Sequence, residues 1–188
     1  MLQNGILALR MFLTLTLLTG VVYPFAVTGI AQTWSAWRAG GSLVRVDGRV
    51  VGSDLLAQKF SATRYFWPRP SSVDYATIPS GASNQGWSSA LLKNTVAERR
   101  ASLEAGRERQ TIPADLRFAS ASGLDPHISP EAALYQLNRV AKARGFDADR
   151  RQKLIALIGQ KVEAPMWGFL GQPRVNVLQL NLALDSLR

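Results

Sequence analysis

The sequence of 188 residues contains no cysteine and a single histidine, His127. Without cysteine the chain can form no disulfide, no thiolate metal site and no thiol-based redox centre. With one histidine it cannot carry the H-E-x-x-H motif or any zinc site built from several histidines. These two absences exclude thiol redox chemistry and the multi-histidine zinc sites.

The motifs that mark nucleotide-binding and acyl-transfer enzymes are also missing. Neither G-x-x-x-x-G-K-[ST] nor G-x-G-x-x-G occurs, so the chain has no recognisable phosphate-binding loop. The D-K-T-G sequence that P-type ATPases phosphorylate is absent. So are the serine motifs G-x-S-x-G and S-x-x-K and the potassium-filter sequence TVGYG. The residues alone therefore predict a non-enzymatic protein that works as a subunit of a larger assembly.

Long runs of one charge sign are absent as well. The chain holds 22 lysines and arginines against 13 aspartates and glutamates, which gives a formal net charge of +9. Its longest basic runs are only the pairs Arg99–Arg100 and Arg150–Arg151. Because a nucleic-acid-binding face would concentrate its positive charge, we expect a mixed, solvated surface and no nucleic-acid partner.

One long uncharged stretch lies near the amino terminus. No charged residue occurs from Met11 to Trp37, and a span of about 20 apolar residues crosses a hydrocarbon core about 30 Å thick. A cleaved signal peptide is the alternative. Its apolar core is usually about 7–15 residues long, and the best cleavage site here, Val27 to Gly29, is poor. We predict a short N-terminus at residues 1–10, a single transmembrane anchor helix at 11–34 and one compact, soluble α+β domain at 35–188.

The anchor carries small residues and a proline. Gly20 and Gly29 let another helix approach closely, so we expect them at a partner interface. Pro24 should bend the helix. The orientation stays open from charge alone: Arg10 precedes the helix and Arg38 follows it, and the positive-inside bias weakens when a long domain follows.

Local signals predict several elements of the domain. Asp47 and Gly48, between two β-branched runs, predict a hairpin with a type I′ turn. Ser129 is a good N-cap with Pro130 at the first helical position, and this helix should stop at Gly145. We expect it to bury its apolar side chains, which are Leu134, Leu137, Val140 and Ala141.

Three further elements follow from weaker signals. A charged helix is predicted at residues 88–109, a short strand at 116–119, and a helix after the N-cap Asp147. Residues 177–187 are ambiguous, because their leucines alternate as in a strand. Asn176 with Gln179 three residues later makes a capping box, so we favour a helix there.

A loop rich in aromatic residues and prolines, residues 64–87, separates these elements. Its tract of Arg64, Tyr65, Phe66, Trp67 and Arg69 has the composition of interface hot spots, so we expect it to face a partner. The alternative is that the loop packs against the core of its own domain. The residues leave both possibilities open.

The stretch SASGLDPHISPEAA, residues 120–133, holds the only histidine between an aspartate and a serine. The members of a catalytic triad are brought together by the fold, so their closeness in sequence is not evidence for a triad. The competing interpretation is a tight turn formed by Gly123, Asp125 and Pro126, with His127 packed at the entrance of a helix capped by Ser129. We favour this structural role and expect no catalytic residue in the stretch.

Several tracts, taken together and in order, resemble one known family. They are RYFWPRPSS, SGASNQG, IPADL, SGLDPHISPEAALYQLNRVAKARG and PRVNVLQLNLALD, all behind one N-terminal anchor. The chain resembles the C subunit of the Kdp-type potassium-transporting ATPase of bacteria over essentially its whole length.

The resemblance implies a location, partners and a role. It implies an inner-membrane, single-pass subunit with its domain in the periplasm and residues 1–10 in the cytoplasm. The implied partners are a channel-like potassium-binding subunit, a P-type ATPase subunit and a small membrane subunit.

The implied role is that of an accessory subunit, or catalytic chaperone, which raises the ATP affinity of the ATPase subunit. ATP and potassium are then handled by the complex, and this chain binds no cofactor itself. The alternative is a nucleotide-binding cofactor subunit that contacts ATP directly.

Overall fold

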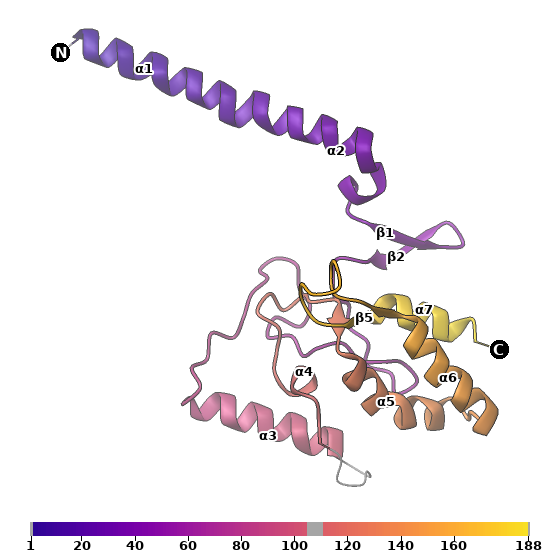
Figure 1. Cartoon of the computed structure of the whole chain (residues 1–188). Helices are drawn as coiled ribbons and strands as arrows, with labels where there is room; N and C mark the ends of the chain where they lie inside the picture. The colour runs from indigo at the N-terminus through magenta and orange to yellow at the C-terminus, as the bar shows by residue number, and fades with distance from the viewer. Residues whose placement is uncertain (1, 105–110, 188) are drawn as a thin grey trace. The chain divides into compact units, whose positions relative to one another are not determined.

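The computed structural model describes residues 2–104 and 111–187. The chain divides into two compact units, Met1–Val51 and Gly52–Arg188. The first unit holds a long helix and most of a β-hairpin, and the second holds a small sheet with helices around it (Figure 1). This arrangement confirms the predicted class, a long apolar N-terminal helix followed by a compact α+β region.

The first unit is dominated by one helical rod that runs from Leu2 to Ala39. It consists of α1 (Leu2–Leu17), a π-helical turn η1 (Leu18–Val22) and α2 (Tyr23–Ala39). Its most apolar window has a mean hydropathy of 1.9 and no buried residue, so the helix is long and apolar enough to cross a membrane. The helix extends beyond the predicted anchor, 11–34, at both ends.

The π-helical turn lies directly before Pro24. There the Tyr23 N–H donates to the carbonyl of Leu18, five residues earlier. Proline has no N–H and its ring collides with the preceding turn, and a π-helical turn is one way to absorb this. The irregularity expected at Pro24 therefore takes the form of a local widening of the helix. A second break lies at Ser35, whose backbone angles are not helical.

A β-hairpin follows the helix. Strands β1 (Leu43–Val46) and β2 (Arg49–Ser53) are joined by Asp47 and Gly48, whose φ angles are 49° and 76°. Two positive φ angles in a two-residue loop define a type I′ turn, which matches the twist of the flanking strands. The predicted hairpin is confirmed.

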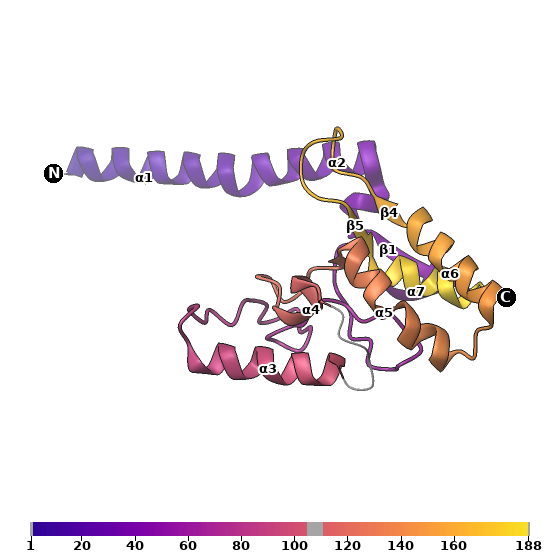
Figure 2. The same cartoon turned by 60° about the horizontal axis from the view of Figure 1, so that its bottom comes forward.

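The second unit is built on a three-stranded antiparallel sheet with the order β3-β5-β4. Central strand β5 pairs with β3 through His127↔Asn176 and with β4 through Val162↔Val175. Helix α6 packs against both α5 and α7, and α3 and α4 lie on the side of α5 that is opposite to α6 (Figures 1 and 2). The elements are β3 (His127–Ile128), β4 (Val162–Glu163), β5 (Arg174–Asn176), α3 (Ala90–Glu104), α4 (Ala114–Arg117), α5 (Pro130–Ala143), α6 (Ala148–Gln160) and α7 (Val177–Asp185).

Three predicted helix starts are confirmed by their caps. The side chain of Ser129 accepts the N–H of Ala132, that of Asp147 accepts the N–H of Arg150, and that of Asn176 accepts the N–H of Gln179. Each cap satisfies an amide that has no partner inside the helix. The cap at Asn176 also resolves the ambiguity at the C-terminus, because α7 is a helix.

Two local predictions are wrong. The strand expected at 116–119 is instead the short helix α4, which begins directly after Pro113 and gives way to extended backbone at Phe118. Leu134, expected inside, is half exposed, whereas Leu137, Val140 and Ala141 are buried. The buried face of α5 is centred closer to Tyr135 and Gln136 than the apolar pattern suggests. The helix predicted at 88–109 is found as α3, and residues 105–109 lie outside the described residues.

Candidate functional site

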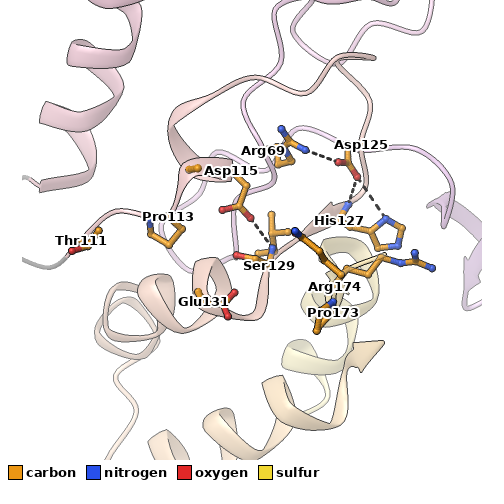
Figure 3. Close-up of a pocket in the computed structure, with 13 residues that line it drawn as sticks. Arg69, Thr111, Pro113, Asp115, Asp125, His127, Ser129, Glu131, Pro173 and Arg174 are labelled. Carbon is orange, nitrogen blue, oxygen red and sulfur yellow. Dashed lines mark hydrogen bonds and ion pairs between the residues drawn. The ribbon is translucent and has the colours of Figure 1, made fainter. Parts of the chain in front are cut away.

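The start of β3 and the start of α5 together form one wall of an open pocket of about 800 Å³. Figure 3 shows Arg69, Asp125, His127, Ser129 and Asp115 around it. These residues come from three separate segments: the aromatic-proline loop, helix α4 and the predicted turn motif. The pocket therefore brings Arg69 to the turn motif, although the two were predicted separately.

Asp125 organises the turn at the pocket. Its Oδ1 atom accepts the backbone N–H of His127 at 3.0 Å, and its Oδ2 atom accepts a hydrogen bond from Arg69 at 3.0 Å. Pro126 lies between Asp125 and His127 in the sequence. Its carbonyl accepts the N–H of Val177 at 3.0 Å and so joins the turn to the first residue of α7. The carboxylate of Asp125 therefore accepts a hydrogen bond from the turn itself and another from the aromatic-proline loop.

The ionisation of Asp125 reflects these contacts. Burial of the carboxyl group raises its pKa, but the nearby His127 side chain and the hydrogen bonds from the His127 backbone and from Arg69 outweigh that effect. The pKa of Asp125 therefore lies below its usual value, because these interactions stabilise the charged carboxylate more than burial destabilises it. At neutral pH the group is an anion that accepts hydrogen bonds, whereas a general acid would have to be protonated.

His127 lies between two carboxylates. Its Nδ1 atom is 3.6 Å from Oδ1 of Asp125, and its Nε2 atom is 3.9 Å from Oε2 of Glu163 on β4. Both distances exceed ordinary hydrogen-bond lengths, and Glu163 is itself paired with Arg174 at 3.0 Å. The ring lies between these two side chains and is one quarter exposed.

Ser129 is used twice by the fold. Its hydroxyl oxygen accepts the N–H of Ala132 at 3.0 Å, and its own N–H donates to Asp115 at 2.6 Å. Asp115 therefore anchors helix α4 to the start of α5. The serine acts as a cap in this structure, which matches the structural role that the sequence favours for the motif.

Gly123 is required by close packing. Its φ angle is +70°, and an added Cβ atom would lie 2.7 Å from Cγ2 of Val73 and 3.0 Å from the carbonyl oxygen of Gly81. Both neighbours belong to the aromatic-proline loop, so the absence of a side chain at Gly123 lets that loop pack onto the turn.

The aromatic-proline loop is held to the helices by buried amides. The side-chain carbonyl of Asn181 accepts the N–H of Phe66 at 2.8 Å, and its amide donates to the Phe66 carbonyl at 3.0 Å. Gln136 does the same for Trp67, with bonds of 2.8 and 3.0 Å. This pair, Asn181 and Gln136, is called the amide clamp below. It lets an irregular segment cross the core with its backbone groups paired.

The clamp determines where the loop side chains lie. Phe66 is fully buried, Tyr65 and Trp67 pack against the core from partly exposed positions, and Arg64 is exposed. The guanidinium of Arg139 lies 3.7 Å from the centre of the Trp67 ring. For Phe66, this is the arrangement that the alternative prediction, packing against the domain's own core, describes.

Tyr75 ties the same loop to Arg69. Its hydroxyl donates to the Arg69 carbonyl at 2.9 Å. Burial first, and then the nearby Asp74 carboxylate, raise the pKa of Tyr75 to about 12, against an opposing effect of Arg99. The hydroxyl therefore stays protonated and keeps donating throughout the physiological range.

Gly20 and Gly29 in the long helix have nothing within 4 Å of an added Cβ atom, so their helix faces are open. Among residues 2–104 and 111–187 no group of three His, Asp or Glu side chains could hold a metal ion. At the pocket, Arg69 pairs with Asp125 and Asp115 accepts the N–H of Ser129, which suits a structural junction.

Comparison with known proteins decides the family. A family model described as K+-transporting ATPase, c chain (KdpC) matches residues 6–186. The chain belongs to the KdpC family. Similar proteins, each named Potassium-transporting ATPase KdpC subunit, occur in Leptospira interrogans, Dechloromonas aromatica and Geobacter sulfurreducens. They are 48%, 50% and 50% identical to this chain. Each alignment covers 96% of this chain, and 92%, 95% and 96% of the relative.

Membership of the KdpC family confirms the resemblance predicted from the sequence tracts. Three residues that hold the site together were not predicted from the sequence, namely Asn181, Gln136 and Asp115. The signal for the first was present, since Asn181 interrupts the apolar run LQLNLAL of α7 with a polar side chain. A buried amide needs partners, but nothing local in the sequence names them.

Proposed function

We propose that this chain is a non-catalytic accessory subunit of a bacterial K+-transporting P-type ATPase. In this proposal residues 11–34 anchor it in the inner membrane, residues 1–10 are cytoplasmic, and residues 35–188 form a periplasmic domain. The observation that carries the proposal is the family match over residues 6–186. The apolar, unburied helix Leu2–Ala39 supports the anchor.

The partners in the proposal are the channel-like potassium-binding subunit, the P-type ATPase subunit and the small membrane subunit. Gly20 and Gly29 would admit a neighbouring helix, because their faces are open and small residues allow close backbone approach. On the domain, the partner-facing surface would consist of the exposed parts of Arg64, Tyr65, Trp67 and Arg69. Phe66 would hold that surface in place from inside.

The proposed role is to raise the affinity of the ATPase subunit for ATP. A periplasmic domain cannot touch cytoplasmic ATP, so the effect would be a coupling between distant sites. Such coupling is typically about 5–150-fold in affinity and is reciprocal. ATP should then strengthen the retention of this chain in the complex by the same factor.

Topology is the first test. Alkaline phosphatase fused after Arg188 should be active, because that enzyme works only in the periplasm, whereas a reporter that fluoresces only in the cytoplasm should stay dark. The opposite result would place the domain in the cytoplasm, the compartment that contains ATP. It would favour the alternative, a nucleotide-binding cofactor subunit.

The coupling is tested on the purified pump with and without this chain. Omitting the chain should raise the KM for ATP, and the KM for potassium should change less. An unchanged KM for ATP would contradict the catalytic-chaperone role while leaving subunit membership intact.

The helix contact is tested separately. Gly20→Leu with Gly29→Leu should release the other subunits during detergent purification while this chain stays in the membrane. Gly5→Leu is the matched control, since it also lies in the helix with an open face but outside the predicted span. Survival of the complex in the double variant would make the helix a simple tether.

A further inference from the structure

The connection between β4 and β5 carries an unusual concentration of exposed apolar side chains. Met166, Trp167, Phe169 and Leu170 surround Gly168, and Trp167 and Phe169 are 78% and 77% exposed. No charged residue occurs between Glu163 and Arg174. Residues 166–170 are called the apolar tip below. Contiguous exposed apolar surface of this kind marks a binding surface more often than a single exposed leucine does.

The apolar tip has a defined shape. Met166 and Leu170 exchange two backbone hydrogen bonds of 2.9 Å, and the Gly168 N–H donates to the Pro165 carbonyl at 3.0 Å. The rings of Trp167 and Phe169 lie 6.4 Å apart, centre to centre. At the base, Arg174 and Glu163 form an ion pair of 3.0 Å across the two strands. The aromatic rings are therefore presented on a closed, hydrogen-bonded turn.

The backbone at Trp167 indicates a role beyond folding. Its φ angle is 54°, in the left-handed region that glycine and asparagine occupy at low cost. A bulky aromatic residue is rarely found there, and strained residues of this kind cluster where function requires them. Folding alone would favour a small residue at this position, whereas a tryptophan exposes a large ring to whatever the tip meets.

We propose that the apolar tip inserts into the interfacial region of the lipid bilayer that anchors the chain. This inference rests on the proposed function only in its requirement that the helix Leu2–Ala39 spans a membrane. The occupant is a membrane surface containing anionic phospholipid. The rings of Trp167 and Phe169 would lie at the headgroup level, where amphipathic and aromatic side chains are favoured.

Tether length and charge make the bilayer the natural occupant. About a dozen residues connect the helix end at Ala39 with the domain start at Gly52, a reach of at most about 45 Å, and the hairpin β1–β2 shortens it. A domain of this size has a radius of gyration of about 14 Å, so its surface stays within reach of the membrane. The net charge of +9 adds attraction to anionic headgroups.

The chemistry of the tip also favours lipid over a protein partner. Interface hot spots usually combine aromatic rings with arginine and directed hydrogen bonds. The five residues of the tip offer apolar area and one indole, with no charged side chain. A bilayer interface requires nothing more, because it has no fixed positions for hydrogen-bond partners.

The test uses the full chain and exploits its lack of cysteine. Phe169→Cys is labelled with the environment-sensitive fluorophore NBD and reconstituted, without other subunits, into vesicles of phosphatidylethanolamine and phosphatidylglycerol. Trp87→Cys is the control, because Trp87 is 96% exposed but its neighbours along the chain are polar, namely Asn84, Gln85, Ser88 and Ser89. Doxyl-labelled lipid should quench the probe at residue 169 several-fold more strongly than at 87. Adding Trp167→Glu to the Phe169→Cys chain should abolish that difference.

Each other outcome overturns a defined part of the proposal. Equal accessibility of both probes to aqueous iodide would show that lipid does not cover the tip. Protection of residue 169 only in the complete pump, with no lipid quenching in vesicles of the chain alone, would assign the tip to another subunit instead. The vesicles are first floated after an alkaline wash. Loss of the chain at that step would refute the membrane anchor, and with it both proposals, whereas retention isolates the test of the tip.

Discussion

The amide clamp leads to a quantitative prediction for Asn181→Ala. Asn181 is 2% exposed, and its side chain pairs both backbone groups of the fully buried Phe66. Truncation leaves a buried N–H and a buried carbonyl without these partners, at about 1–3 kcal/mol each, so about 2–6 kcal/mol together. A domain of this kind has about 5–15 kcal/mol of stability in all. The loss is therefore a large share of the total.

The assay is urea denaturation of the full chain in detergent, followed by near-ultraviolet circular dichroism. With a typical dependence of about 2 kcal/mol per molar urea, the midpoint should fall by about 1–3 M. Asn138→Ala is the matched control. Asn138 is exposed on α5, where it accepts hydrogen bonds from Arg151, so its loss should change stability by no more than about 0.5 kcal/mol. Similar midpoints for the two variants would refute the assignment of the clamp.

Three further predictions concern the turn at the pocket. Gly123→Ala should destabilise the domain more than Gly145→Ala, since both sites have positive φ but only Gly123 is crowded. We expect about 1–2 kcal/mol for the backbone strain at either site and about 1–3 kcal/mol more for the overlap at Gly123, measured by denaturation. Equal losses would contradict the close packing. The folded-state pKa of Asp125 is lowered, so its stabilising contribution is complete above its unfolded value of about 3.9 and is lost as the pH falls through the folded value. The stability difference between wild type and Asp125→Asn should therefore be constant near neutral pH and shrink below about pH 4, whereas a constant difference down to acid unfolding would count against this hydrogen-bonding role. His127→Gln should leave potassium-stimulated ATP hydrolysis by the intact pump close to the wild-type rate, and a loss of about a hundredfold or more, the scale of a missing general acid or base, would restore a chemical role for the residue.

The predictions that succeeded from sequence are local ones. Ser129, Asp147 and Asn176 each cap a helix whose first amides lie within three residues, so the partners are close in sequence. The turn at Asp47 is likewise decided by two residues that accept positive φ angles. The failures are local patterns too short to be decisive. Helix α4 has only four residues, too few to show a reliable hydrophobic period. Leu134 lies at the border of the apolar face of α5.

The fold class, the apolar helix, the helix ends and the family could be predicted from the residues, because these depend on composition, on neighbouring residues or on tracts that stand in order along the chain. The inward position of Phe66, the pairing of Arg69 with Asp125 and the exposure of Trp167 at positive φ became visible only in the folded chain. The partners of Phe66 and Arg69 are 115 and 56 residues away along the chain. Such pairings depend on how the helices pack, since a buried amide or a charged group is stable only where the folded chain brings it a partner.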